Sequence, residues 1–233
     1  MAGRGGSPTV PRRKLGCFAV LIALFLAPLA GVLIHAVVPP PITLLMVQRL
    51  FEGEGLHVRW RSLERISPDL VDAVIAAEDA RFCEHNGFDL EAIQDAMEDN
   101  ADGGRVRGGS TISQQTAKNV FLWPGRSWIR KGLEAGYTVL IETFWSKRRI
   151  MEVYLNVAEM GPGVYGAEAA ARYWFDKSAS ELTRSEAAHL AAILPNPREY
   201  RAAGSGPYVR RRARSIQANM SEVRAQGLSD CTT

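Results

Sequence analysis

Residues 67–85 read SPDLVDAVIAAEDARFCEH, and this stretch joins a helix start to a dense group of ionisable side chains. A serine followed by proline is typical of a helix N-terminus, and the apolar residues that follow recur at helical spacing. We expect this helix to end near Phe82. Glu78 continues its apolar stripe instead of facing water. Two interpretations stay open: a carboxylate paired with Arg81 at a fraying helix end, or a partly desolvated one whose raised pKa suits proton transfer.

Beyond this stretch, residues 42–233 contain no internal repeat, and almost every periodic segment has helical rather than alternating spacing. We therefore predict a mostly α fold with one folded domain. Residues 100–109 are polar and rich in glycine, which indicates a loop that moves. The further helices that we expect cover residues 89–97, 111–119, 128–144, 147–157, 166–174, 183–194 and 209–225.

The amino-terminal region predicts a membrane anchor. Residues 15–38 carry no charge, and as a helix they would span about 36 Å, enough to cross a hydrocarbon core of about 30 Å. A cleaved signal peptide is the alternative, but no clean small-x-small cleavage site follows. The basic residues that end the segment 1–14 predict a cytoplasmic tail on a single-pass membrane protein, with the remainder of the chain on the outer side of the membrane. A proline-rich linker over 39–43, the domain over 44–226 and a tail over 227–233 would follow.

Composition narrows the function classes. The chain has 233 residues, 46% hydrophobic and 23% charged, with a formal net charge of +3. Four of its basic residues precede residue 15, and without them 24 basic residues stand against 25 acidic ones. A nearly neutral domain argues against nucleic-acid binding. Three cysteines without C-x-x-C spacing and four scattered histidines predict no structural metal site.

A glycine pair precedes the helix expected from Thr111, in the stretch GGSTISQQTAKN over residues 108–119. Free N–H groups and the helix dipole at such a start favour a phosphate, and Lys118 lies further along the same helix. The alternative is an ordinary capped junction between loop and helix. The stretch is not a P-loop, because the Gly-Lys-Ser/Thr ending is absent.

Basic residues cluster on two later helices. Arg130, Lys131 and Glu134 are spaced so that both cations can contact one carboxylate. Taken alone, this is a surface ion pair worth less than about 1 kcal/mol. Residues 147–149 read KRR, and two interpretations stay open: a solvated helix start, or an extension of the positive patch. Cations at a helix start oppose the helix dipole, which favours the second.

Together these segments resemble the catalytic domain shared by the monofunctional biosynthetic peptidoglycan transglycosylases and the glycosyltransferase half of class A penicillin-binding proteins. The resemblance covers roughly residues 44–220, and five motifs in the family's order are far more specific than any one of them. Residues 125–136, GRSWIRKGLEAG, are most similar to the monofunctional branch. The motifs are Glu78-Asp79-x-x-Phe82-x-x-His85, Gly109-Ser110-Thr111-x-x-Gln114-Gln115-x-x-Lys118-Asn119, Arg130-Lys131-x-x-Glu134, Arg149-Ile150-x-Glu152-x-Tyr154-Leu155-Asn156 and Leu190-Ala191-Ala192-Ile193-Leu194-Pro195-Asn196-Pro197.

The resemblance implies a lysozyme-like, mostly helical lobe with a small membrane-side jaw, preceded by one transmembrane helix. It implies transfer of a growing polyprenyl-pyrophosphate-linked chain onto the 4-hydroxyl of a lipid-linked disaccharide pentapeptide, with inversion to a β-1,4 linkage. It implies no tightly bound cofactor, although a divalent cation, Mg or Mn, could assist at the pyrophosphate. The implied partners are the precursor, the growing glycan chain, the membrane and cell-division proteins.

The resemblance also assigns roles to residues. Glu78 would be the general base, and Glu134 would position the cations or the donor. Lys118, Arg130 and Lys131 would stabilise the leaving pyrophosphate. No metal ligand is assigned. The other expected substrate-binding residues are Asp79, Phe82 and His85, which would complete the acceptor pocket, and Ser110, Thr111, Gln114, Gln115 and Asn119.

Two other function classes compete with this one. Lysozyme and lytic transglycosylases have a similar lobe and cleave glycan with one acidic glutamate, but a hydrolase has no pyrophosphate that requires so many cations. A non-catalytic scaffold of the division machinery is the other, and the presence of both glutamates weighs against it. No Ser-x-x-Lys or Lys-Thr-Gly triplet indicates an attached transpeptidase. Cys83 occupies a variable position of the first motif, and a pairing with Cys231 stays open.

Overall fold

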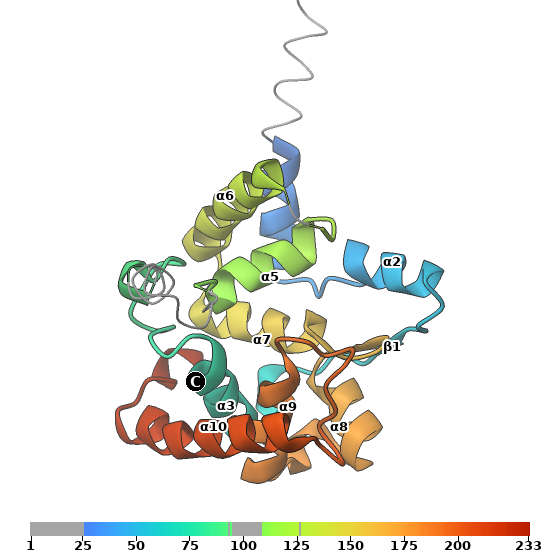
Figure 1. Ribbon diagram of the computed structural model, residues 1–233. Coiled ribbons are helices and arrows are strands. Elements are labelled where there is room, and N and C mark those ends of the chain that lie inside the picture. Colours follow the sequence, from blue (N-terminus) through green and yellow to red (C-terminus); the bar gives the residue numbers. More distant parts are fainter. Residues whose placement is uncertain (1–25, 93, 95–108, 126) are drawn as a thin grey trace, which may run out of the picture.

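The computed structural model describes residues 26–92, 94, 109–125 and 127–233, which form a mostly helical molecule with one small sheet (Figure 1). The predicted mostly α fold is confirmed. Residues 26–35 are helical and precede the labelled elements. The α-helices are α2 (Leu44–Phe51), α3 (Pro68–Glu78), α5 (Ile112–Phe121), α6 (Trp128–Phe144), α7 (Lys147–Val157), α8 (Ala167–Phe175), α9 (Arg184–Ile193) and α10 (Pro207–Ala225), and the 3-10 helices are η1 (Leu63–Arg65), η2 (Ala179–Glu181) and η3 (Asp230–Thr232).

Helix α7 lies between two groups of helices (Figure 1). On one side, α5 packs against both α6 and α7. On the other side, α3, α9 and α10 pack against one another, and α8 contacts α7. The side chains of Ile75 from α3, Ile150 and Leu155 from α7, and Leu190 from α9 are completely buried in the core between them. Burying each such side chain contributes about 1.5–3 kcal/mol to folding.

The sheet was not predicted. It contains β1 (His57–Val58), β2 (Glu159–Gly161) and β3 (Val164–Tyr165), with β3 in the centre, parallel to β1 and antiparallel to β2. Strands of two and three residues are too short to show an alternating pattern. The backbone of Gly163 has φ +66°, and a Cβ there would lie 2.2 Å from the carbonyl oxygen of Glu54. Only glycine therefore permits the close approach that pairs β1 with β3.

Helix α3 is shorter than predicted: it ends at Glu78 and not near Phe82. Asp79 leaves the helical conformation, with φ −163° and ψ 76°. Its carboxylate accepts a hydrogen bond from the backbone N–H of Ile112, 2.9 Å away, at the start of α5. A long-range contact, which helical spacing cannot reveal, thus ends the helix and leaves Glu78 at its last position.

The predicted helix starts are confirmed where a capping side chain was identified. Thr111 and Gln114 form a capping box at α5, and Thr183 forms one with Glu186 at α9. The hydroxyl of Ser127 accepts from the backbone N–H of Arg130 at the start of α6, at 3.1 Å. The other predicted helices between residues 147 and 225 are present with ends shifted by up to two residues. Such side-chain caps are worth about 1 kcal/mol each.

Some predictions fall on residues that the structure does not describe. The tail over 1–14 and the loop over 100–108 lie outside the described residues, and of the helix expected over 89–97 only 90–92 and 94 are described, as helix. Among the described residues, no helix combines the length and apolar composition that crossing a bilayer requires.

The described end of the predicted anchor packs on the domain. Trp145 donates its indole N–H to the carbonyl oxygen of Val32, at 2.8 Å. Arg149 donates to the carbonyl oxygen of His35 at 3.1 and 3.0 Å. Residues 26–38 are therefore fastened to α6 and α7 before the chain reaches α2, which begins close to the predicted start of the domain.

Asn156, from the fourth motif, ties the chain before α3 to α7. Its side chain accepts from the N–H of Arg61 and donates to the carbonyl oxygen of the same residue, both at 2.8 Å. Because Asn156→Ala leaves these buried backbone groups unpaired, we expect it to lower the free energy of unfolding by about 2–4 kcal/mol and the Tm by about 5–15 °C. Thermal unfolding measures this. The control is Asn219→Ala, at an exposed position of α10, which should change stability by less than about 0.5 kcal/mol.

Candidate active site

Glu78 lies at the C-terminal end of α3, where three other elements meet it. Its side chain is 14% exposed. Gln115 of α5 donates an amide N–H to Glu78 Oε2 at 3.0 Å, and Arg212 of α10 lies 3.3 Å from Oε1. The hydroxyl of Tyr154 from α7 donates to Gln115 Oε1 at 3.2 Å, which fixes the orientation of the amide. The carboxylate is therefore held by a chain of buried or partly buried groups from separate helices.

The pKa of Glu78 is raised above its ordinary value. Burial is the largest cause, and it is opposed by the hydrogen bond from Gln115 and by the positive charges of Arg212 and Lys118. A carboxylate with a raised pKa is a stronger base once it is ionised. The interpretation of Glu78 as a residue at a fraying end paired with Arg81 is wrong, because Arg81 instead forms an ion pair with Asp89.

Asp79 and His85 form a rigid frame next to Glu78. His85 Nε2 lies 2.8 Å from Asp79 Oδ1, and the N–H of Gly87 donates to His85 Nδ1 at 3.1 Å. Because Nδ1 accepts, the ring proton is on Nε2 and is donated to Asp79. Thr111 Oγ1 donates to the carbonyl oxygen of Gly87 at 2.7 Å. These contacts fix the loop that follows α3 against the start of α5.

Phe82, Thr111 and Gln114 are among the predicted substrate-binding residues that are buried. Phe82 is completely enclosed in the core, with Lys147 Nζ 4.5 Å from the centre of its ring. Thr111 and Gln114 are buried and engaged in their capping box. The burial of these side chains favours a role in shaping the site over direct contact with a ligand.

The second and third motifs meet at a group of cations. Arg130 Nη1 lies 3.3 Å from Glu134 Oε2, and Lys131 contacts the other oxygen of the same carboxylate. Lys131 Nζ also lies 3.4 Å from Ser110 Oγ. Glu134 is buried, so this is not the surface ion pair that the spacing alone allowed. Arg130 Nε is buried and makes no hydrogen bond with the described part of the chain, which leaves a donor for an anionic ligand.

Lys118 belongs to the same group. Burial lowers its pKa, the charge of Glu134 opposes this, and the neighbouring Arg130 and Lys131 lower it further. The cations thus outnumber the nearby carboxylates. Buried cations with too few anions to neutralise them favour a negatively charged ligand.

Glu78 and the cation group line two different cavities. The first, of about 350 Å³, is lined among others by Glu78, Asp79 and Ser110. The second, of about 240 Å³, is lined among others by Lys118, Asn119 and Arg130. Ser110 precedes α5 and Lys118 lies near its end, so the two cavities open towards opposite ends of one helix. The sequence motifs therefore place the Glu78 carboxylate at one cavity and the cations Lys118 and Arg130 at the other.

The comparisons with known proteins fit this arrangement. A family model described as Transglycosylase matches residues 46–221. The chain belongs to the transglycosylase family. The match confirms the resemblance predicted from the five motifs.

The transglycosylase is also similar to curated relatives. One is the biosynthetic peptidoglycan transglycosylase of Caulobacter vibrioides, 57% identical over 216 residues that cover 91% of this chain and 94% of the relative. Another, from Xanthomonas campestris pv. campestris, is 53% identical, and the match covers 94% of this chain and 93% of the relative. A third, from Rhodospirillum centenum, is 52% identical, and the match covers 95% of this chain and 96% of the relative. Both carry the same name as the first.

Two residues of the transglycosylase site were not predicted. Tyr154 stands in the fourth motif, which could have indicated it, but it reaches Glu78 only through Gln115. Arg212 lies on α10, among the arginines of the RRRAR run over residues 210–214, and no motif distinguished it from its neighbours. Only the packing of α10 against α3 shows which arginine meets the carboxylate.

The predicted extension of the positive patch by residues 147–149 is wrong. Lys147 donates to the carbonyl oxygen of His85 at 2.6 Å and pairs with Glu142 at 2.8 Å. Arg148 donates to the carbonyl oxygen of Thr232, and Arg149 to that of His35. These three cations fasten other segments of the transglycosylase to α7 and do not face the Lys118 cavity.

A cation site can be tested against the donor groups present. Asp79, His85 and Asp89 offer ligand atoms within 4.8 Å of one another. Each is already engaged: the first two with each other and Ile112, and Asp89 with Arg81 and the N–H of Ala92. Glu134, beside the cations, is likewise paired with Arg130 and Lys131. These groups do not fit a divalent ion, because their ligand atoms are already paired.

Proposed function

We propose that this transglycosylase polymerises peptidoglycan glycan strands by transferring a growing polyprenyl-pyrophosphate-linked chain onto a lipid-linked disaccharide pentapeptide. The observation that carries the proposal is the pairing of one carboxylate of raised pKa at the first cavity with Lys118 and Arg130 at the second, where cations outnumber the nearby carboxylates. An acceptor that must lose a proton suits the first, and a pyrophosphate leaving group suits the second.

In this reaction Glu78 takes the proton from the 4-hydroxyl of the acceptor sugar. The oxygen forms a bond to the anomeric carbon of the donor chain, while the bond from that carbon to the pyrophosphate oxygen breaks. The electron pair of the broken bond leaves on the polyprenyl pyrophosphate, and the proton stays on Glu78 until solvent removes it. A single displacement inverts the donor from α to β, which gives the β-1,4 linkage.

The cation group stabilises the charge that develops on the pyrophosphate. Lys118 and Arg130 line the second cavity, and Lys131 stands beside them on α6. Glu134 holds Arg130 and Lys131 in fixed positions, so the site does not need to reorganise when the bond breaks. Asn119, Ser110 and Gln115 have polar groups next to these cavities and are proposed to bind sugar or phosphate oxygens.

We also propose that the domain works against the inner membrane on its periplasmic side, with the helix of residues 15–38 as anchor and α6 in the small jaw of a lysozyme-like fold. Trp128 is 93% exposed and Ile129 is 77% exposed on α6, and Phe144 and Val139 are exposed further along the same helix. Residues 26–35 lie at the same end of the molecule (Figure 1). A large exposed apolar surface beside an anchor supports contact with lipid. Cell-division proteins remain proposed partners.

Arg212 gives a test of the base through pH. Glu78 must be ionised to act, so activity falls as pH drops through its pKa in the folded protein. Since the charge of Arg212 lowers that pKa, Arg212→Ala should move the acid limb of the kcat/KM profile to higher pH, with the largest loss, several-fold, at the acid end.

The conservative Arg212→Lys keeps a positive charge and should restore most of the acid limb. An arginine that only supports packing would lower kcat equally at every pH. A profile of unchanged shape in Arg212→Ala would therefore remove Arg212 from the account of the base.

The function itself is tested with purified full-length protein in detergent and two separate substrates: the lipid-linked disaccharide pentapeptide, and preformed glycan strands. The proposal predicts long strands from the first substrate and no shortening of the second. Shortened strands without polymerisation would favour a lysozyme-like cleaving enzyme, and inactivity on both would favour a scaffold.

A further inference from the structure

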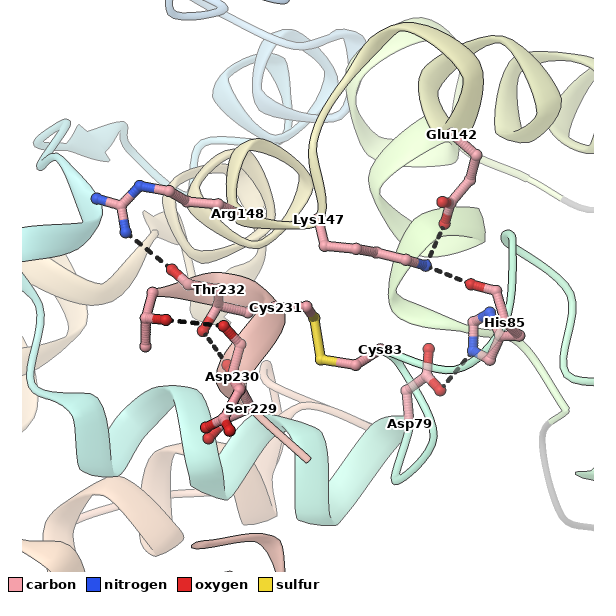
Figure 2. Close-up of a disulfide and its surroundings, with 11 residues drawn as sticks. Asp79, Cys83, His85, Glu142, Lys147, Arg148, Ser229, Asp230, Cys231 and Thr232 are labelled. Carbon is pink, nitrogen blue, oxygen red and sulfur yellow. Dashed lines mark hydrogen bonds and ion pairs between the residues drawn. A yellow bond between two sulfur atoms is a disulfide. The ribbon is translucent and has the colours of Figure 1, made fainter. Parts of the chain in front are cut away.

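A disulfide joins the loop after Glu78 to the end of the chain (Figure 2). Cys83 and Cys231 are 148 residues apart in the sequence, and their Cα atoms are 5.6 Å apart. This separation lies within the ordinary range for a disulfide, so no backbone movement is needed to close it. Both side chains are half-buried against the core. The pairing that the sequence left open is present in the structure.

The tail that carries Cys231 is held in position by contacts that do not involve sulfur. Arg148 of α7 donates to the carbonyl oxygen of Thr232 at 2.8 Å (Figure 2). Arg224, in the last turn of α10, lies 2.9 Å from Asp69 and 2.5 Å from Asp72 on α3. The end of the chain therefore has contacts to α3 and α7 in addition to the sulfur bond. The family match ends at residue 221, before this tail begins.

The loop that carries Cys83 directly follows Glu78, and Asp79 within it is bonded to the start of α5. Asp79 and His85 lie on either side of Cys83 in the sequence, and their side chains are hydrogen-bonded to each other. Lys147 donates to the carbonyl oxygen of His85, and the sulfur bond lies beside that contact (Figure 2). The disulfide thus fixes the middle of a loop whose two ends are fixed by hydrogen bonds, and it fixes it to α7 through η3.

We propose that the Cys83–Cys231 disulfide is a covalent clasp, introduced by an exported thiol–disulfide oxidant, that fastens the C-terminal tail to the catalytic loop. In the oxidation, the two thiols lose two protons and two electrons and form one S–S bond, and a disulfide of the oxidant is reduced to two thiols. Such bonds persist in the bacterial periplasm and are rare in the cytosol. The clasp is therefore made on the side of the membrane where the proposed function places the domain.

The clasp should stabilise the fold chiefly by restricting the unfolded chain, since it closes a loop that spans most of the domain. Its effect on catalysis rests on the proposed function. A loop that is held at both ends and in the middle keeps Asp79 in place. Asp79 bonds the start of α5, and Gln115 of α5 bonds Glu78, so the loop also fixes the position of Gln115 relative to Glu78. Reduction should therefore lower kcat several-fold and leave KM for the lipid-linked substrate nearly unchanged.

The test uses full-length protein exported by the producing cells and purified in detergent without reductant, in a Cys17→Ser background that removes the third cysteine. Mass spectrometry of the unreduced digest should show one peptide pair joined through Cys83 and Cys231, and a maleimide should label neither. Reductant should expose both thiols and lower the Tm by about 5–15 °C.

Cys83→Ser and Cys231→Ser should each resemble the reduced protein in Tm and kcat and should not respond to reductant. Free thiols in the exported native protein, or a Tm that reductant does not change, would overturn the clasp. Labelling and melting do not depend on polymerisation. An intact clasp in a protein that makes no glycan would therefore contradict the proposed function alone.

Discussion

Replacing Glu78 with glutamine is expected to lower kcat for glycan polymerisation by about 10²–10⁴-fold while KM changes little. Glutamine keeps the size of the side chain and can still accept the hydrogen bond from Gln115, but it cannot take a proton. The loss therefore reports proton transfer and not the shape of the cavity. Initial rates with the lipid-linked disaccharide pentapeptide measure it.

Glu91→Gln is the matched control. Glu91 lines the same cavity, but its carboxylate is exposed and pairs with Arg81. Its replacement should reduce the rate by less than about tenfold. Equal losses in the two variants would mean that negative charge near the cavity matters and that Glu78 is not the base. A Glu78→Gln protein with more than a tenth of the wild-type kcat would also show that Glu78 is not the base. Circular dichroism and Tm establish that both variants fold.

Replacing Lys118 with glutamine is expected to lower kcat by about 10²–10³-fold, because the buried charge that faces the leaving pyrophosphate is lost. Lys118→Arg keeps a charge in a larger side chain and should recover part of the rate. An unchanged Tm separates this loss of rate from a loss of folding. Because the charge of Lys118 also lowers the pKa of Glu78, the acid limb of the pH profile should move to higher pH, as in Arg212→Ala.

Lys177→Gln is the control for Lys118. Lys177 is a partly exposed lysine that follows α8 and lies 2.9 Å from Glu186 of α9. Its replacement should leave the rate unchanged. If Lys118→Gln keeps full activity, the second cavity does not hold the leaving group, and the assignment of donor and acceptor sides must be abandoned.

Much of the fold follows from local sequence signals. The caps at Thr111, Ser127 and Thr183 mark helix starts because their hydroxyls satisfy N–H groups that every helix leaves free. What could not be predicted depends on long-range contacts. The end of α3 is set by Asp79 and Ile112, and the strand pairing by the close approach at Gly163, both between segments distant in sequence.

Some residues of the candidate site could likewise be predicted from the sequence, and others depend on long-range packing. The sequence predicted Glu78 from its position on an apolar helix face, and Lys118 and Glu134 from the motifs that resemble the family's. They did not identify Arg212, whose meeting with Glu78 depends on how α10 packs on α3. Spacing also cannot show burial, so Phe82 was expected to touch the acceptor although its ring is enclosed.

The most direct measurement counts both products of one reaction: disaccharides added to glycan strands and polyprenyl pyrophosphate released, from wild-type protein and the lipid-linked disaccharide pentapeptide. If Glu78 activates an acceptor whose attack expels the pyrophosphate from the Lys118 side, the two amounts rise together in equal proportion. Glycan fragments that appear without released polyprenyl pyrophosphate would contradict the account.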